Sequence, residues 1–584
     1  MKHFSLRTAA GIFCMLSSAA AFALPAKQGV IAAEQPDGTT VFIRLEGDER
    51  HHKAYSSDGY LLTNDKEGFY VFADCDAQGN IVATSLREIN PEQRSAATIS
   101  KLATINQATL MDASVKARSN APARNPGLFS TQFPSKGEHN AIAILVEFKN
   151  KKFSIEDPND YFTRMLNEEG FSDYNSTGSA RDFFIECSEG IFKPYFDVYG
   201  PIELDQNYNY YGQNDAYGNE PNCWKLIVDG CQALDDEIDF SLYDANEDGY
   251  IDNVYVFYAG FGEADGGNAN TIWPHSWDIE YATSQAYYLD GVRLNHYACS
   301  NELQYYGGLP DGIGSFVHEF GHVMGLPDLY STTYSNAFTP GPWDVMDQGS
   351  YNNNSRTPPA YSSYERYALE WMEPTLLTES GEYELLDLRE SHSAFILQTD
   401  KEDEFYLLEN RQQNGNDAFI PGHGMLVWHI DFDQRVWNSN VVNNTATHQF
   451  VDLIEADNKA TAASRKGDSF PGTGKVTSFT DETTPAFVSW SGKPMAVNLY
   501  DIEENDGVIT FRAESTSETG IGSISSADNA LRVNGNTIMV SAGTANVYDL
   551  SGRHIASVGA APVELPSGMY IVSLDGKTAK IAIR

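Results

Sequence analysis

The chain has 584 residues, of which 39 are Lys or Arg and 81 are Asp or Glu, so its formal net charge is −42. A protein this acidic repels phosphate backbones, which argues against nucleic-acid binding. Hydrophobic residues make up 41% of the chain and aromatic residues 12%, as is typical of a mostly globular protein. The length is enough for several domains.

The first residues have the pattern of an export signal. Lys2 and Arg7 give a basic start, an apolar stretch follows over residues 9–23, and Ala21-Phe22-Ala23 fits a small-x-small cleavage site. The apolar stretch is too short to span a bilayer comfortably, and no other run is long enough. We predict a signal peptide over residues 1–23 and a mature protein without a transmembrane segment.

Residues 24–136 are predicted to form a separate N-terminal region that ends in a linker. Short strand-like runs at 41–45 and 68–73 are separated by turn signals. Residues 116–137 are rich in Pro, Ser and Arg, which is typical of an exposed linker that proteases cut.

The rest of the chain divides into three predicted parts. Strand and helix patterns mix over residues 137–375, where the run at 141–148 predicts a buried strand and Ser179 with Asp182 predicts a capping box that opens a helix. Residues 376–514 show mostly strand patterns, which predict a β-sandwich. A Ser/Gly/Thr linker over 515–526 then leads into a small all-β domain over 522–584.

Removal of the signal leaves five cysteines, an odd number that excludes full internal pairing: Cys75, Cys187, Cys223, Cys231 and Cys299. A helical pattern over residues 222–234 places Cys223 and Cys231 about 12 Å apart along the helix axis. That separation is too large for a disulfide between these two residues. His275, in the run Trp-Pro-His-Ser-Trp, is open to either a structural or a functional role.

The central motif predicts a zinc site on a helix. His318 and His322 are four residues apart and share a helix face, so both imidazoles can bind one zinc ion. Glu319 lies about 100° around the helix, where it can act on water rather than on the metal. Gly325 can take the left-handed conformation that ends a helix, after which Asp328 can return as a third ligand. Three protein ligands leave one position open, as a catalytic zinc requires.

The alternative for this motif is a core helix with two partly buried histidines. We prefer the zinc site because two His beside a Glu are a costly choice for packing alone. The pattern H-E-x-x-H-x-x-G-x-x-D resembles the immune inhibitor A family of metallopeptidases, relatives of the metzincins, which usually have a third His where this chain has Asp328. The run Trp343-Asp344-Val345-Met346-Asp347 resembles the family's methionine turn, so Met346 is expected beneath the zinc.

This resemblance also includes residues 35–39, 406–411 and 429–431, so it covers the chain from about 34 to 512. It implies a metzincin-like α+β catalytic domain over residues 137–375, preceded by a propeptide, and thus a zymogen. The implied reaction is hydrolysis of peptide bonds in extracellular protein or peptide substrates. Zinc is expected to polarise the scissile carbonyl, and Glu319 to take a proton from the attacking water and pass it to the leaving amine.

Two questions about this reaction stay open. Some metzincins hold the oxyanion with a Tyr two residues after the turn methionine; here that position is Gln348, and Tyr351 is an alternative. A function of a different class is a surface adhesin built on a catalytically inactive peptidase scaffold. The intact His318, Glu319, His322 and Asp328 favour the enzyme, because an inactive scaffold has no physical need for Glu319.

A second pattern predicts a calcium site. Oxygen-bearing residues alternate, with Gly249 at the sixth position, as at the start of an EF-hand-type loop: Asp244, Asn246, Asp248, Tyr250 through its carbonyl, and Asp252. Position twelve is Tyr255 rather than Glu, so Asp252 or a residue elsewhere has to supply the final carboxylate. The family resemblance also implies structural calcium. The alternative is an ordinary polar turn.

The two ends of the chain carry further hypotheses. Cys75 is either a thiolate that caps the zinc in the precursor or an inert cysteine, and the lack of electropositive neighbours favours the latter. The C-terminal domain, with Tyr-Asp-Leu-Ser-Gly-Arg at 548–553, resembles the sorting domain of type IX secretion. It implies the type IX machinery as a partner and passage through the periplasm to the cell surface or medium. The alternative is a carbohydrate- or protein-binding β-module.

Overall fold

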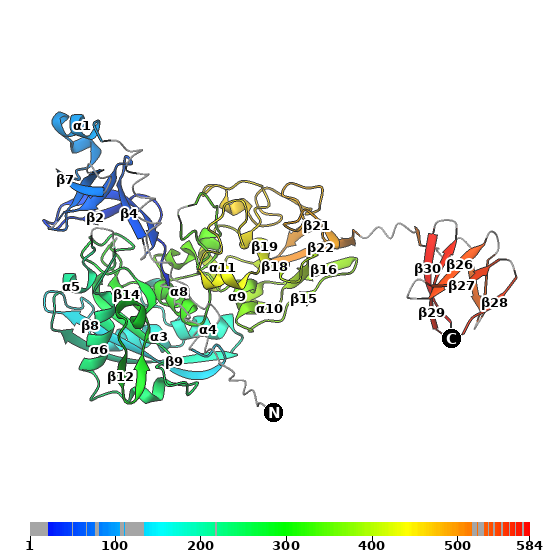
Figure 1. The fold of residues 1–584 in the computed structure, drawn as a ribbon, viewed down its shortest axis with the longest axis horizontal. Coiled ribbons are helices and arrows are strands. Elements are labelled where there is room, and N and C mark those ends of the chain that lie inside the picture. Colours follow the sequence, from blue (N-terminus) through cyan, green and yellow to red (C-terminus); the bar gives the residue numbers. More distant parts are fainter. Residues whose placement is uncertain are drawn as a thin grey trace, which may run out of the picture.

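The computed structural model describes residues 22–584 except 49–50, 66, 76–80, 106–109, 111–132, 216–218, 306, 334, 517–521, 524–530, 535–536, 541–543, 550–552, 560, 567, 575–576 and 584. Figure 1 shows four groups of elements that follow one another along the chain. The predicted signal peptide, apart from its last two residues, and most of the 116–137 linker lie outside the described residues. No helix of the described part of the chain is long and apolar enough to cross a membrane.

The N-terminal group is an antiparallel sheet whose strands are hydrogen-bonded in sequence order. Its strands are β2 (Ile31–Glu34), β3 (Thr40–Asp48), β4 (His51–Ser56), β5 (Leu61–Asn64), β6 (Tyr70–Cys75) and β7 (Ile81–Arg87), and helix α1 (Ala96–Leu102) follows them. Alternate residues of β3 are buried, beginning with Val41 and Ile43, because successive side chains of a strand point to opposite faces. The buried face packs with Ala264 and Trp273 of the next group.

The second group is built on a mixed sheet with the order β1-β11-β14-β10-β8-β9. Strands β8 (Gly137–Phe148), β9 (Phe192–Leu204), β10 (Val254–Phe261) and β14 (His296–Leu303) run parallel to one another. Strand β11 (His275–Asp278) pairs antiparallel with β14, and β1 (Phe22–Ala23) pairs antiparallel with β11. A segment from the start of the chain therefore forms one edge of this sheet.

Helices cover both faces of this sheet, which explains the continuous apolar run of β8. Residues 141–146 are all buried and alternate between two cores, which confirms the predicted buried strand. Helices α3 (Pro158–Asn167), α4 (Ala180–Cys187), α8 (Ile313–Val323) and α9 (Ser363–Ala368) contribute to one core, and α5 (Tyr208–Gly212) and α6 (Cys223–Ala233) to the opposite core. The predicted capping box of Ser179 and Asp182 is confirmed at the start of α4.

The third group has two sheets around a common core. One contains β15 (Thr375–Leu376), β17 (Phe395–Gln398), β18 (Glu404–Arg411), β19 (Gly424–Asp431) and β20 (Val451–Leu453); the other contains β16 (Gly381–Leu385), β21 (Val497–Asn505) and β22 (Val508–Ser515). Strands β18 and β19 are buried along most of their length. Leu407 and Trp428 project from them into the core that contains helix α8, so this β-rich region packs directly against the support of the predicted site.

The C-terminal group forms two small sheets around a core of its own. The first has β23 (Gly522–Ser523), β30 (Lys577–Ile583), β29 (Gly568–Leu574), β26 (Ala545–Asp549) and β27 (His554–Val558); the second has β24 (Leu531–Asn534), β25 (Thr537–Val540) and β28 (Val563–Glu564). Figure 1 shows this group at the far end of the molecule from the N-terminal sheet.

Candidate active site

Helix α8 carries the central motif and is buried on every side. Glycines allow this close packing: a Cβ at Gly312 would lie 2.1 Å from the Ser355 carbonyl oxygen, and one at Gly314 would lie 2.0 Å from that of Ser350. The helix ends at Val323 with Met324 as its C-cap, and Gly325 follows with a φ of +99°. The Gly325 N–H donates to the His322 carbonyl and the Leu326 N–H to the Gly321 carbonyl, the two hydrogen bonds of a Schellman motif.

The chain then returns so that three donor atoms converge. His318 Nε2 lies 3.1 Å from His322 Nε2 and 3.4 Å from Asp328 Oδ1, and His322 Nε2 lies 3.1 Å from the same oxygen. Ligand atoms about 2.0–2.1 Å from a tetrahedral zinc ion lie about 3.3 Å from one another. The spacing therefore fits the edges of a zinc coordination tetrahedron.

Backbone carbonyls fix both imidazoles in the orientation that metal binding requires. His318 Nδ1 lies 2.8 Å from the Val345 carbonyl oxygen and His322 Nδ1 lies 2.8 Å from that of Leu326. Because a carbonyl only accepts hydrogen bonds, each Nδ1 carries the hydrogen and each Nε2 keeps its lone pair for the metal. Burial also lowers the pKa of His322, which favours the neutral ring.

Asp328 is held by a residue that sequence reasoning missed. The Asn440 side-chain amide donates to Asp328 Oδ2, and its oxygen accepts the Asp328 N–H at 2.8 Å. Asn440 lies 112 residues further along the chain, in the β-rich region. The only local signal was an Asn-rich stretch at 438–444, which is typical of a turn.

Met346, which the resemblance places beneath the zinc, packs against helix α8 in the structure. A Cβ at Gly321 would lie 2.7 Å from Met346 Sδ and 2.8 Å from the Tyr361 hydroxyl. The Met346 carbonyl accepts a hydrogen bond from the Leu329 N–H at 2.9 Å. The methionine turn thus supports both the helix that carries the histidines and the segment that carries Asp328.

The N-terminal segment, residues 22–27, occupies the space beside Glu319. The Leu24 N–H donates to Glu319 Oε1 at 3.0 Å, and the backbone on its N-terminal side pairs with β11 in the register Ala23 to His275. Its carbonyls are also bound, by Trp273 Nε1 at Leu24, the Tyr351 hydroxyl at Pro25 and Gln348 Nε2 at Ala26. Leu24 is 1% exposed, so the segment is buried rather than laid over the surface.

The structure gives the surroundings of four residues whose roles the sequence left open. Gln348 and Tyr351 both bind backbone carbonyls of the N-terminal segment. Cys75 is not among the donor atoms that meet at the zinc motif; it ends β6 and packs against a small cluster within the N-terminal group. His275 is buried in β11, with Nε2 2.9 Å from the Tyr297 hydroxyl.

The predicted calcium loop has the hydrogen bonds of a ligand loop but no closed cluster of carboxylates. Asp244 accepts from the N–H groups of Asp248 and Gly249, Asn246 from that of Asp248, and Asp248 from that of Tyr250. Asp252 accepts from the Ala245 N–H, and burial raises its pKa to about 7. Among the described residues, these carboxylates do not form a group with all donor atoms within 4.8 Å of one another.

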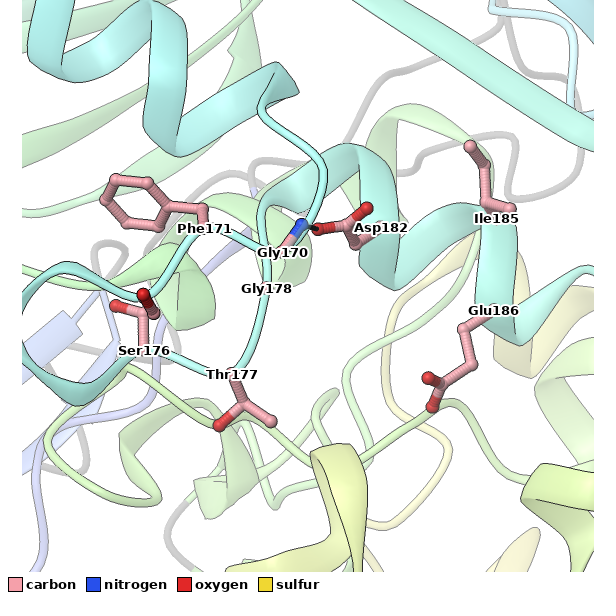
Figure 2. A pocket seen from close by; sticks show the side chains of 9 residues that line it. Gly170, Phe171, Ser176, Thr177, Gly178, Asp182, Ile185 and Glu186 are labelled. Atoms are coloured by element: carbon pink, nitrogen blue, oxygen red, sulfur yellow. Dashed lines mark hydrogen bonds between the residues drawn. The ribbon is translucent and has the colours of Figure 1, made fainter.

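A surface depression of about 480 Å³ lies beside helix α4, away from this motif (Figure 2). Its two carboxylates already serve local structure. Asp182 accepts from the N–H groups of Gly170 and Ser179, and Glu186 binds the Arg389 guanidinium. We therefore place the functional centre at helix α8 and not at this depression.

Comparison with known proteins agrees with this assignment. Residues 131–375 match the family described as immune inhibitor A peptidase M6, catalytic domain. The chain is 25% identical over 246 residues to the pre-pro-metalloprotease PrtV of Vibrio cholerae serotype O1, covering 37% of this chain and 26% of that protein. It is 29% identical over 162 residues to immune inhibitor A of Bacillus thuringiensis subsp. alesti, covering 24% and 22%. The chain thus matches about a quarter of the length of these relatives, and the matched part is a metallopeptidase domain of the hydrolase class.

The close approach of Met346 to helix α8 predicts the effect of Gly321→Ala. The added methyl group would overlap Met346 Sδ and the Tyr361 hydroxyl, so we expect a loss of about 1–3 kcal/mol in the free energy of unfolding. Gly230→Ala in helix α6 is the control, because its nearest neighbour, Val146 Cγ1, lies 3.4 Å away and Ala is the better helix former. Urea unfolding measures the free energy of unfolding of both variants. Equal stability of the two variants would contradict the close packing of Met346 against Gly321.

Proposed function

We propose that this chain, in which residues 131–375 match a peptidase M6 catalytic domain, is the precursor of an exported zinc endopeptidase. The observation that carries the proposal is the meeting of His318, His322 and Asp328 at tetrahedral spacing next to Glu319. The relatives' printed names, a pre-pro-metalloprotease and an immune inhibitor, support a protease made as a precursor.

The donor set fits zinc. Two neutral imidazoles and one carboxylate are ligands that zinc accepts in catalytic sites, and three protein ligands leave a position open. Zinc bound there would supply Lewis acidity that polarises a carbonyl and makes water a better nucleophile at neutral pH.

Glu319 is placed to move the proton. Its Oε1 already accepts a hydrogen bond from a backbone amide nitrogen, that of Leu24, at 3.0 Å. A carboxylate at hydrogen-bonding distance from an amide nitrogen can deliver to a leaving amine the proton that it has taken from water. We infer that Glu319 is the general base and then the general acid of peptide hydrolysis.

The contacts of the N-terminal segment support a proposal for how a substrate strand would bind. It adds antiparallel to β11, and Trp273, Tyr351 and Gln348 hold three successive carbonyls. Backbone hydrogen bonds of this kind bind many sequences, because they do not depend on side chains. If the Leu24 nitrogen occupies the position of the leaving amine, Trp273, Tyr351 and Gln348 bind the part of the substrate on the C-terminal side of the cleaved bond. Neither Gln348 nor Tyr351 is then assigned to stabilise the oxyanion.

The same contacts support synthesis as a zymogen. While the N-terminal segment lies beside Glu319, it fills the place of a substrate strand, and the sheet of β2 to β7 anchors it. Signal cleavage after Ala23 would turn the Leu24 nitrogen into an ammonium group next to the Glu319 carboxylate, which adds charge to the hydrogen bond. Cleavage in the linker over 116–137 would detach this region. Export by the signal peptide and the C-terminal sorting domain stays part of the proposal.

Glu319→Gln tests the catalytic role. The variant keeps the shape of the side chain but cannot take a proton, so we expect its hydrolysis of denatured casein to fall by at least about 10²–10⁴-fold. Both proteins are first cut with trypsin in the 116–137 linker, and phenanthroline is expected to stop the wild type. Glu168→Gln, at an exposed position after α3, is the control. Equal rates for wild type and Glu319→Gln would exclude the base role, and an inactive wild type with intact zinc would favour the adhesin.

Leu24→Asp tests the latency. Burial of a leucine side chain contributes about 1.5–3 kcal/mol to the binding of the segment that carries it. Loss of this contribution should release the N-terminal segment from Glu319 and raise the activity of the uncut precursor at least about tenfold. Val30→Asp, at a residue of the same region that is 54% exposed, should leave the precursor as inactive as wild type. All three proteins should have the same activity after the propeptide is removed. If Leu24→Asp and Val30→Asp precursors are equally inactive, the N-terminal segment is not the inhibitor.

We also propose that the loop of Asp244, Asn246, Asp248, Tyr250 and Asp252 binds calcium, and thermal unfolding tests this. Calcium added after treatment with EGTA should raise the unfolding midpoint, since a ligand at one hundred times its Kd stabilises by about 2.7 kcal/mol. Asp244→Ala should abolish the shift and Asp236→Ala, an exposed control, should keep it. A midpoint that calcium leaves unchanged would show that the loop is a polar turn.

A further inference from the structure

A second group of buried donor atoms lies on the other side of the six-stranded sheet. Cys223, His275 and Cys299 bring their ligand atoms within 4.8 Å of one another, and all three residues are buried. Cys223 and Cys299 belong to the core opposite the one that contains helix α8. Among the described residues, this group and the His318, His322 and Asp328 group are the two that meet this criterion.

The fold brings these residues together from three elements. His275 in β11 and Cys299 in β14 are directly paired across the antiparallel ladder, so their side chains share one face of the sheet. Cys223 is the first residue of helix α6. Burial, and then the neighbouring Cys299 sulfur and Glu220 carboxylate, raise the pKa of the Cys223 thiol well above the usual value, so a bound cation would be needed to hold it as a thiolate.

The distances fit a metal ion. Cys299 Sγ lies 3.6 Å from His275 Nδ1. A sulfur about 2.3 Å and a nitrogen about 2.0–2.1 Å from a tetrahedral zinc ion lie about 3.6 Å apart. Two thiolates and an imidazole would give three protein ligands. The Glu220 carboxylate lies beside Cys223 but outside the group within 4.8 Å, so it would have to move toward the ion to give the four ligands found in closed structural sites.

His275 can present Nδ1 to a metal through a change of tautomer. Nδ1 lies 2.7 Å from the Trp273 carbonyl oxygen, while Nε2 lies 2.9 Å from the Tyr297 hydroxyl. A hydroxyl both donates and accepts, so Tyr297 can hold the ring with its hydrogen on either nitrogen. In the structure the Trp273 carbonyl takes the Nδ1 hydrogen, so metal binding at Nδ1 would move that hydrogen to Nε2 and replace this hydrogen bond. Tyr297 would then accept from Nε2 and orient the ring, as partners of metal-bound histidines do.

We propose that Cys223, His275 and Cys299, completed by Glu220, bind a structural zinc ion distinct from the ion at helix α8. The site joins helix α6 to strands β14 and β11. Glu220 also accepts the Trp273 N–H at 2.6 Å, and Trp273 in turn binds the Leu24 carbonyl. The second ion therefore fixes the edge strand, and the tryptophan before it, that hold the N-terminal segment.

Metal content and cobalt spectroscopy of the full chain test this proposal. Glu319→Gln protein, which does not digest itself, is loaded with zinc or with cobalt. We expect two ions per chain, one for each donor group, and a thiolate-to-cobalt charge-transfer absorption in the near ultraviolet. His322→Ala should remove one ion and leave this absorption unchanged, because no cysteine belongs to the group at helix α8.

Cysteine variants assign the second ion. Cys299→Ser and Cys223→Ser should each lose one ion and the charge-transfer absorption, whereas Cys231→Ser, a buried cysteine of the same helix α6, should keep both. The cobalt spectrum of the parent protein decides the question even if a serine variant fails to fold. One ion per chain without thiolate absorption would overturn the proposal, as would a Cys223–Cys299 disulfide found by peptide mass spectrometry without reduction.

Discussion

The structure depends on keeping three lone-pair atoms about 3 Å apart inside the protein. His318 Nε2, His322 Nε2 and Asp328 Oδ1 repel one another unless a cation lies between them, so the surroundings have to hold them in place. Carbonyl oxygens behind the two imidazoles and the Asn440 amide behind the carboxylate do this. The helices, the methionine turn and the β-rich region are arranged around that requirement.

Strand β11 connects the two donor groups. One of its edges pairs with β14 and, through His275, reaches the cysteine pair. Its other edge pairs with the N-terminal segment, whose Leu24 N–H donates a hydrogen bond to Glu319. A zinc ion held between α6, β14 and β11 would therefore stiffen the strand along which a peptide is aligned. In the proposed mechanism this alignment matters, because a small displacement of the scissile bond from Glu319 would slow proton transfer.

Features that depend on neighbouring residues could be predicted from the sequence. The spacing of His318 and His322, the helix end at Gly325 and the capping box at Ser179 follow from helix geometry alone. Asn440, Trp273 and the Cys223–His275–Cys299 group could not be predicted in this way, because their partners are distant in the chain. The Leu24 contact with Glu319 spans 295 residues. A single sequence gives no signal for such pairs, since only the paired strands and packed cores bring them together.

The place of β1 has a consequence for the chain before activation. A sheet edge with unpaired N–H and C=O groups is a template on which other chains can pair and aggregate. While β1 pairs with β11, this edge of the sheet is covered by the protein's own backbone. Before the proposed signal cleavage, β1 would thus keep other chains from pairing with this edge. A cut after Ala23 would remove β1 and open the edge of β11 to a substrate strand, while residues 24–26 keep their own contacts beside Glu319.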